Sequence, residues 1–199
     1  MEDIFHNLET IAQYCGVGKE GEKLVSALQL KWKRIKQKTP QWADGMPRVN
    51  VACISCANPL TSSGYWIPEI ISSAGGWSLC SKIGYPNESM TLKDLVGSDP
   101  DAIVYLCRGL HFGIIARELS RLVTSNEWRK IKAIKANRFF VIDSNKYVTK
   151  SKHMCSLWLR LTSVILVIMI ARHSSHLVVM AACFVTHRMS PLWLLVNGL

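Results

Sequence analysis

The sequence predicts an α/β fold in which an N-terminal helical segment precedes a single lobe built on a parallel sheet flanked by helices. Three observations lead to this prediction. Apolar residues recur at helical spacing through the first 38 residues. Short apolar runs suited to buried strands follow at 49–54, 102–107 and 138–143. Helical patterns separate these runs at βαβ spacing, which favours parallel strands joined by right-handed crossovers.

Residues 1–39 are predicted to form either a helical hairpin or one long bent helix. The Gly-Val-Gly sequence at 16–18 divides the segment, and Thr39-Pro40 ends it because a residue that precedes proline avoids the helical conformation. Residues 40–47 are then a short linker. The inward faces are predicted to carry Ile4, Leu8, Ile11 and Cys15 in the first helix and Leu24, Leu28, Trp32 and Ile35 in the second.

The lobe is predicted to span residues 48–150 and to begin with a strand, a loop and a helix over 48–76. The loop contains the turn-forming residues Asn58, Pro59 and Gly64. Pro68 lies near the start of the helix, where a missing N–H costs nothing, and the glycine pair at 75–76 stops the helix. In an open α/β sheet, ligands bind in loops at the carboxyl edge of the strands.

The remaining elements of the lobe follow from local signals. Residues 77–88 are predicted to be a loop, and Thr91 and Asp94 have the spacing of a capping box that begins a helix. The apolar run 102–107 suits a strand buried on both faces. A helix with Ile115, Leu119 and Leu122 inward comes next, and a second helix, opened at 126–128 and broken at Asn137, precedes the strand at 138–143.

Charge and cysteine usage narrow the functional classes. The 24 basic residues exceed the 14 acidic ones, giving a net charge of +10, but no nucleic-acid-binding motif accompanies this excess. We therefore expect no nucleic-acid partner. The seven cysteines have no disulfide framework and the acidic N-terminus does not resemble a signal peptide. These features predict reduced cysteines and a cytosol-facing location.

Residue patterns that carry chemistry are few. Cys53 and Cys56 have the C-x-x-C spacing of a redox pair or of half a zinc site. Because Cys53 falls within a predicted strand and no second pair follows, structural packing is the favoured interpretation, with a thiol oxidoreductase as the least favoured function. No catalytic constellation or phosphate-binding loop is present, so we expect no enzyme activity, no metal site and no required cofactor.

The order of the elements resembles a known family. The carrying stretches are the helix pair LETIAQYCGVGKEGEKLVSALQLKWKRI, the strand, loop and helix RVNVACIS…GYWIPEIISSAGG, the segment TLKDLVGSDPDAIVYL, and EWRKIKAIKANRFFVID. Together they resemble the C-terminal lobe of a periplasmic substrate-binding protein of the iron-siderophore and cobalamin type, preceded by its interlobe helix. The resemblance covers about 8–150, and the cobalamin-binding subgroup is the nearest.

This resemblance implies a non-catalytic binding module for a bulky ligand such as a corrinoid or an iron-siderophore. Members of the family close two lobes about their ligand, whereas one lobe presents half a site, which binds weakly unless the missing N-terminal lobe or another chain completes the cleft. Glu69 is implied as a contact to a transporter. The implied ligand-binding residues are Tyr65, Trp66, Arg108, His111, Phe112, Asn145 and Tyr147.

The C-terminal tail, 151–199, falls outside the family pattern. It contains four basic residues and no acidic residue, and its apolar runs are interrupted by Arg172, His173 and His176 before they reach the roughly 20 residues that span a bilayer. Three interpretations stay open: membrane association through 157–185, a buried or oligomerising helix, and a sequence without selected structure, such as the product of an altered transcript. The first supports an alternative function, a membrane-associated interaction protein anchored by the tail.

Overall fold

The computed structural model describes residues 1–38, 48–107 and 112–143. The chain divides into two compact units, Met1–Gln41 and Trp42–Leu199. Within the described ranges, no helix combines the length and the apolar character that crossing a membrane requires. The tail at 151–199, for which membrane association is one of three open interpretations, lies outside these ranges.

The first unit is a hairpin of two helices, α1 (Glu2–Tyr14) and α2 (Gly18–Lys38). Of the two predicted arrangements, the hairpin is therefore the one observed. The predicted inward faces are partly wrong, because Ile11, Cys15 and Leu24 are exposed. The buried residues include Phe5 and Ala12 of α1 and Gly21, Val25 and Trp32 of α2.

Close packing between small residues explains this rotated face. Gly21 is buried, and a Cβ atom at this position would overlap the side chain of Ala12. The two helices therefore approach each other where neither residue carries bulk. The prediction from large apolar side chains places the contact face of each helix about one residue too early in the sequence, because glycine and alanine do not stand out as apolar positions.

The second unit holds a five-stranded sheet. The strands are β1 (Val49–Ala57), β2 (Leu60–Ser62), β3 (Gly76–Ser78), β4 (Ala102–Cys107) and β5 (Phe139–Asp143). Their order is β2-β1-β4-β5, with β3 also paired to β1. The strands β3, β4 and β5 run parallel to their neighbours, and β2 alone pairs in the antiparallel sense. The predicted parallel sheet is thus confirmed.

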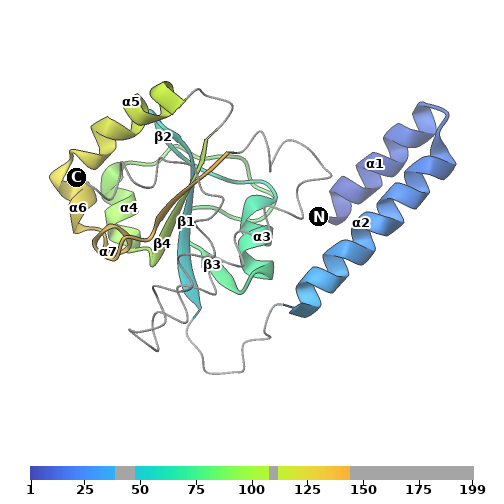
Figure 1. Ribbon diagram of the computed structural model, residues 1–199, viewed down its shortest axis with the longest axis horizontal. Coiled ribbons are helices and arrows are strands. Elements are labelled where there is room, and N and C mark those ends of the chain that lie inside the picture. Colours follow the sequence, from blue (N-terminus) through green and yellow to red (C-terminus); the bar gives the residue numbers. More distant parts are fainter. Residues whose placement is uncertain (39–47, 108–111, 144–199) are drawn as a thin grey trace. The chain divides into compact units, whose positions relative to one another are not determined.

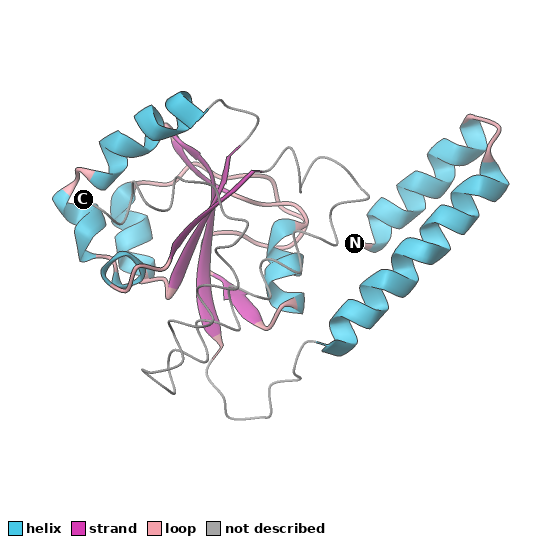
Figure 2. Ribbon diagram, in the orientation of Figure 1, coloured by secondary structure: helices cyan, strands magenta, loops and turns pink. Residues whose placement is uncertain are grey.

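Helices cover both faces of the sheet, as Figures 1 and 2 show. Helix α3 (Ile67–Ser73) lies on one face, and the other face carries α4 (Leu92–Ser98), α5 (Phe112–Val123), α6 (Asn126–Lys130) and α7 (Lys132–Lys135). A cluster of buried side chains joins the second set of helices to the sheet; among its members are Ala52, Ile54, Leu95, Ile103, Tyr105, Ile115, Leu119, Trp128, Ile131 and Phe139. The Trp128 and Phe139 rings meet edge to face, with their centroids 5.4 Å apart.

Local sequence signals predict the ends of several elements correctly. The Thr91 hydroxyl accepts a hydrogen bond from the Asp94 backbone N–H at 3.2 Å, and the Asp94 carboxylate accepts one from the Thr91 N–H at 2.8 Å, which completes the predicted capping box of α4. The predicted inward residues Ile115 and Leu119 are buried in α5. The last predicted helix is broken in two, because Ile131 adopts an extended conformation between α6 and α7.

Two strands differ from the prediction. The predicted loop after β1 contains β2, which folds back on β1 with Ala57 paired to Leu60 and Ile54 paired to Ser62. The predicted loop at 77–88 begins with β3, which pairs with the first three residues of β1. Both strands have three residues, too few to show an alternating pattern in the sequence. The nine-residue β1 therefore pairs with two short strands, β2 and β3, along one side.

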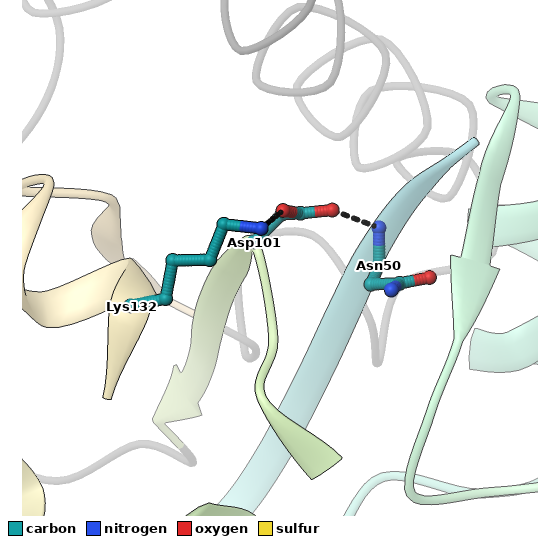
Figure 3. A network of polar contacts seen from close by, with 3 residues as sticks. All are labelled: Asn50, Asp101 and Lys132. Carbon is teal, nitrogen blue, oxygen red and sulfur yellow. Dashed lines mark hydrogen bonds and ion pairs between the residues drawn. The ribbon is translucent and has the colours of Figure 1, made fainter. Parts of the chain in front are cut away.

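A buried carboxylate ties the amino ends of β1 and β4 to α7 (Figure 3). Asp101 is buried, and one of its carboxylate oxygens accepts the Asn50 backbone N–H at 2.9 Å. The other oxygen lies 2.8 Å from the ammonium of Lys132, whose side chain is 52% exposed. The Asp101 N–H donates in turn to the Asn50 carbonyl at 2.8 Å.

Candidate functional site

The segment 63–66 leads from the sheet into α3. Its first residue, Ser63, donates its backbone N–H to the carbonyl of Cys53, in the middle of β1, at 2.8 Å. Trp66 is the N-cap of α3, and Pro68 lies in the first turn of that helix, as the sequence predicted. Because β2 turns the chain back before this point, Tyr65 and Trp66 follow the returning strand and not the carboxyl end of β1.

Tyr65 has an unusual backbone conformation. Its φ is 55°, in the left-handed region that residues with a side chain rarely adopt. Its N–H donates to the Tyr85 carbonyl at 2.6 Å, and its own carbonyl accepts the Gly84 N–H at 3.0 Å. Such strain costs about 1–3 kcal/mol and persists only where the surrounding structure imposes it. The two hydrogen bonds to the 84–85 segment impose it here, while the side chain is 48% exposed.

Neighbouring side chains extend the aromatic surface around Tyr65. The Trp66 ring centroid lies 6.0 Å from that of Tyr65, and the planes are inclined at 39°. Tyr85 is 57% exposed, and the ammonium of Lys82 lies 5.8 Å from the centroid of its ring. We call Tyr65, Trp66, Lys82 and Tyr85 the Tyr65–Tyr85 face. The indole N–H of Trp66 is buried and has no hydrogen-bond partner within the described part of the chain.

A polar network holds the two chain segments of this face together. The Gly64 N–H donates to the Asn87 side-chain carbonyl at 2.8 Å, and the Asn87 amide donates to the Ser55 hydroxyl at 3.4 Å. Gly64 is buried, and a Cβ atom there would overlap the backbone carbonyls of Tyr85 and Pro86. Glycine is thus required where the 85–87 backbone passes over the 63–66 segment.

The other predicted site residues are either half-buried or lie wholly or partly outside the residues that the structure describes. Glu69, the predicted transporter contact, is half-buried in the first turn of α3. Phe112 opens α5, and its side chain lies outside the described part. Arg108, His111, Asn145 and Tyr147 also lie outside the described residues. The structure therefore brings together Tyr65 and Trp66 of the predicted set.

Sequence reasoning missed Lys82 and Tyr85. Both lie in the segment predicted as a loop, 77–88, and no pattern within that segment marks them. Only the pairing of Tyr65 with Tyr85 through the backbone makes them neighbours of the predicted residues. A Tyr-Pro sequence beside Gly84 signals a turn, but it gives no information on which surface the ring will join.

The C-x-x-C cysteines show no sign of redox chemistry. Cys53 is buried, and this burial raises the pKa of its thiol to about 12, although a hydrogen bond with Ser63 opposes the shift and Cys80 adds to it. The thiolate is the reactive form, so this thiol is poorly reactive. Cys56 is half-buried, and its thiol lies 3.3 Å from the Asn58 carbonyl. The described residues contain no group of three or more side chains suited to hold a metal ion.

Comparison with known protein families identifies the family to which this chain belongs. The model of the periplasmic binding protein family matches residues 1–146. The chain belongs to this family. No curated protein sequence matches the chain. The sequence-based resemblance is therefore confirmed at the level of the family, whereas the expected cytosol-facing location gains no support from a family described as periplasmic.

Solved structures of this fold include several substrate-binding proteins. An ABC transporter substrate-binding protein from Listeria monocytogenes EGD-e has a TM-score of 0.69 and 15% identity, over 81% of this chain and 63% of that one. The vitamin B12 binding protein BtuF of Vibrio cholerae has a TM-score of 0.64 and 11% identity, over 83% of this chain and 61% of that one. A heme binding protein from Pseudomonas aeruginosa has a TM-score of 0.64 and 18% identity, over 82% of this chain and 59% of that one. At these identities the likeness shows the fold alone.

The chain covers only part of these relatives. It spans 63% of the Listeria protein, 61% of the Vibrio protein and 59% of the Pseudomonas protein. The matching portion is a mixed α/β lobe with a predominantly parallel sheet, as predicted.

Proposed function

We propose that the lobe binds a bulky, flat small molecule through the Tyr65–Tyr85 face and catalyses no reaction on it. The observation that carries this proposal is the strained conformation of Tyr65. A tyrosine held at φ 55° by two backbone hydrogen bonds, with its ring half exposed, costs stability without filling the core. Strain of this kind clusters where the surrounding structure fixes a residue for a function.

The chemistry of the face suits a large conjugated ligand. Tyr65 and Tyr85 expose rings that offer flat apolar surface at a low cost in conformational entropy, since each ring has only two rotatable bonds. Lys82 offers a positive charge to a carboxylate or phosphate of the ligand. Cobalamin and heme have this combination of a large conjugated macrocycle and polar groups at its rim.

Residues that follow β4 and β5 in the sequence would supply further contacts. We propose Arg108 for a carboxylate or phosphate of the ligand, because its planar fork binds such groups in a bidentate manner. His111 and Phe112 adjoin it in sequence, and Asn145 and Tyr147 follow β5. One lobe supplies one wall of a cleft, so we expect an affinity below that of a two-lobed site unless a second lobe or chain closes over the ligand.

Thermal unfolding of the full chain with and without cobalamin, hemin and a ferric hydroxamate tests this proposal. A ligand that binds only the folded state stabilises it by about 2.7 kcal/mol at a hundredfold excess over Kd. We expect a rise in the midpoint with at least one ligand, and Tyr85→Ala should remove most of that rise. Tyr14→Ala is the matched control, because Tyr14 is 90% exposed on α1, outside the face.

Two results would overturn the proposal. A cooperative transition whose midpoint no ligand moves would mean that the lobe keeps the fold without this binding function. A rise that survives both Tyr65→Ala and Tyr85→Ala would place the ligand elsewhere on the protein. Spectral titration of hemin or cobalamin absorbance, followed at equilibrium, distinguishes weak binding from none.

A further inference from the structure

A cavity lies along the edge of the sheet at β3 and shares one residue, Lys82, with the Tyr65–Tyr85 face. Its volume is about 720 Å³, within the range of sites for small molecules, roughly 300–1,000 Å³. Residues of α3, β3, the following segment and α4 line it, including Ser72, Trp77, Lys82, Glu88, Met90 and Asp94. Of the Tyr65–Tyr85 face, only Lys82 reaches this cavity.

Trp77 gives the cavity an accessible aromatic wall. It is the central residue of β3 and pairs with Asn50 through the backbone, so its position is set by the sheet. Its side chain is 56% exposed. An indole face is the strongest of the aromatic partners for a positive charge, because its π electrons present a negative surface.

The ionisable groups of the cavity carry an excess of negative charge. Two acidic residues, Glu88 and Asp94, are among those that line it, against one basic residue, Lys82. Hydrogen bonds from the hydroxyl and the backbone N–H of Thr91 lower the pKa of Asp94, a carboxyl group that is charged near neutral pH even at its ordinary pKa. Lys82 lies over the ring of Tyr85, which does not line the cavity. This excess contrasts with the net charge of +10 of the whole chain.

We propose that this cavity binds an organic cation, a small molecule that carries a primary or quaternary ammonium group, with the ammonium held between Trp77 and the carboxylates of Glu88 and Asp94. An anion would meet two carboxylates at this site. A neutral apolar ligand would bury the same surface without gaining from either the indole face or the negative charge. Serine hydroxyls in the lining, such as that of Ser72, can accept hydrogen bonds from a primary ammonium.

A pair of probes of equal shape tests the charge requirement on the full chain. Choline and 3,3-dimethylbutan-1-ol differ mainly in the quaternary nitrogen, and calorimetric titration at low ionic strength measures both. We expect choline to bind and the neutral alcohol to bind at least tenfold more weakly. Trp77→Ala should weaken choline binding roughly two- to thirtyfold, the range that cation–π contacts span. Glu88→Gln should weaken it as well, and Tyr14→Ala should leave it unchanged.

Equal binding of the two probes, or no binding of choline, would overturn the proposal. A choline affinity unaffected by Trp77→Ala and Glu88→Gln would also overturn it, because the cation would then bind elsewhere. Trp77→Phe keeps an aromatic face and should retain most of the affinity, which separates loss of the contact from loss of the fold. Binding of hemin or cobalamin by Trp77→Ala, unchanged from the parent chain, would show that this cavity and the Tyr65–Tyr85 face act separately.

Discussion

The strain at Tyr65 can be measured by comparing two truncations of the same side chain. Tyr65→Ala and Tyr65→Gly both remove the ring, so they lose the same packing and differ only in whether a Cβ atom remains. At an ordinary position with negative φ, glycine is the less stable by about 0.5–1 kcal/mol, because it loses more backbone entropy on folding. At φ 55° a Cβ atom costs about 1–2 kcal/mol, which glycine avoids.

The sign of the difference should therefore be reversed at this position. We expect the Tyr65→Gly variant to be the more stable of the two by about 0.8 kcal/mol, the difference between the midpoints of the strain that glycine relieves and of its entropic cost. This corresponds to roughly 1–4 °C in Tm for a chain of this size. Urea unfolding followed by circular dichroism gives both free energies, and fits in which the two variants share one m value make the comparison most precise.

Arg117 provides the matched control. It is exposed in the interior of α5, where the backbone is helical, so Arg117→Gly should be less stable than Arg117→Ala by about 1 kcal/mol. A Tyr65→Ala variant more stable than Tyr65→Gly, as expected at position 117, would contradict this prediction. That result would mean that the 64–66 segment relaxes to negative φ once the ring is removed, and that strain at Tyr65 carries no argument for function.

Three further predictions concern the fold. Asp101→Ala should lower the free energy of unfolding by about 1–3 kcal/mol in urea, because it leaves the part-buried Asn50 N–H without its acceptor; an effect under about 0.5 kcal/mol would contradict the role of this carboxylate. Gly64→Ala should lower the free energy of unfolding by more than about 2 kcal/mol, whereas Gly97→Ala, with open space around its Cβ, should leave it unchanged or raise it by up to about 1 kcal/mol. Cys53 should resist a thiol reagent in the native protein while the exposed Cys15 reacts. Equal labelling of Cys53 and Cys15 at neutral pH would refute this difference in reactivity. Because the pKa of the Cys53 thiol is raised from 9.0 to about 12 in the folded state, the contribution of the protonated thiol to stability is complete below pH 9 and is lost as the pH rises toward 12.

Patterns within single segments predicted most of the lobe. The apolar runs of β1, β4 and β5 and the capping box of α4 are local features, and the parallel arrangement follows from their order along the chain. The short strands β2 and β3 could not be predicted, since each exists only by pairing with β1. The face of the helical hairpin was misjudged because Gly21 and Ala12, which are small, set the distance between its helices.

The candidate site was predictable to a smaller extent. Tyr65 and Trp66 stand out as adjacent aromatics in a turn-rich stretch, and the family resemblance drew attention to them. Tyr85 lies twenty residues further on and joins Tyr65 only through backbone hydrogen bonds, which no local pattern encodes. The buried Asp101 was missed for a related reason, because its partners Asn50 and Lys132 are distant in sequence.

The division of one side of β1 between two short strands also bears on aggregation. A long exposed edge strand presents a continuous row of backbone donors and acceptors that can pair with another molecule. Here β2 and β3 are three residues each and pair with different halves of β1 in opposite directions. The 88–90 backbone further covers β2, through the hydrogen bonds of Ser62 to Glu88 and of Met90 to Leu60. Among the residues that the structure describes, an incoming strand therefore finds only β3 on this side, which is too short a template for stable intermolecular pairing.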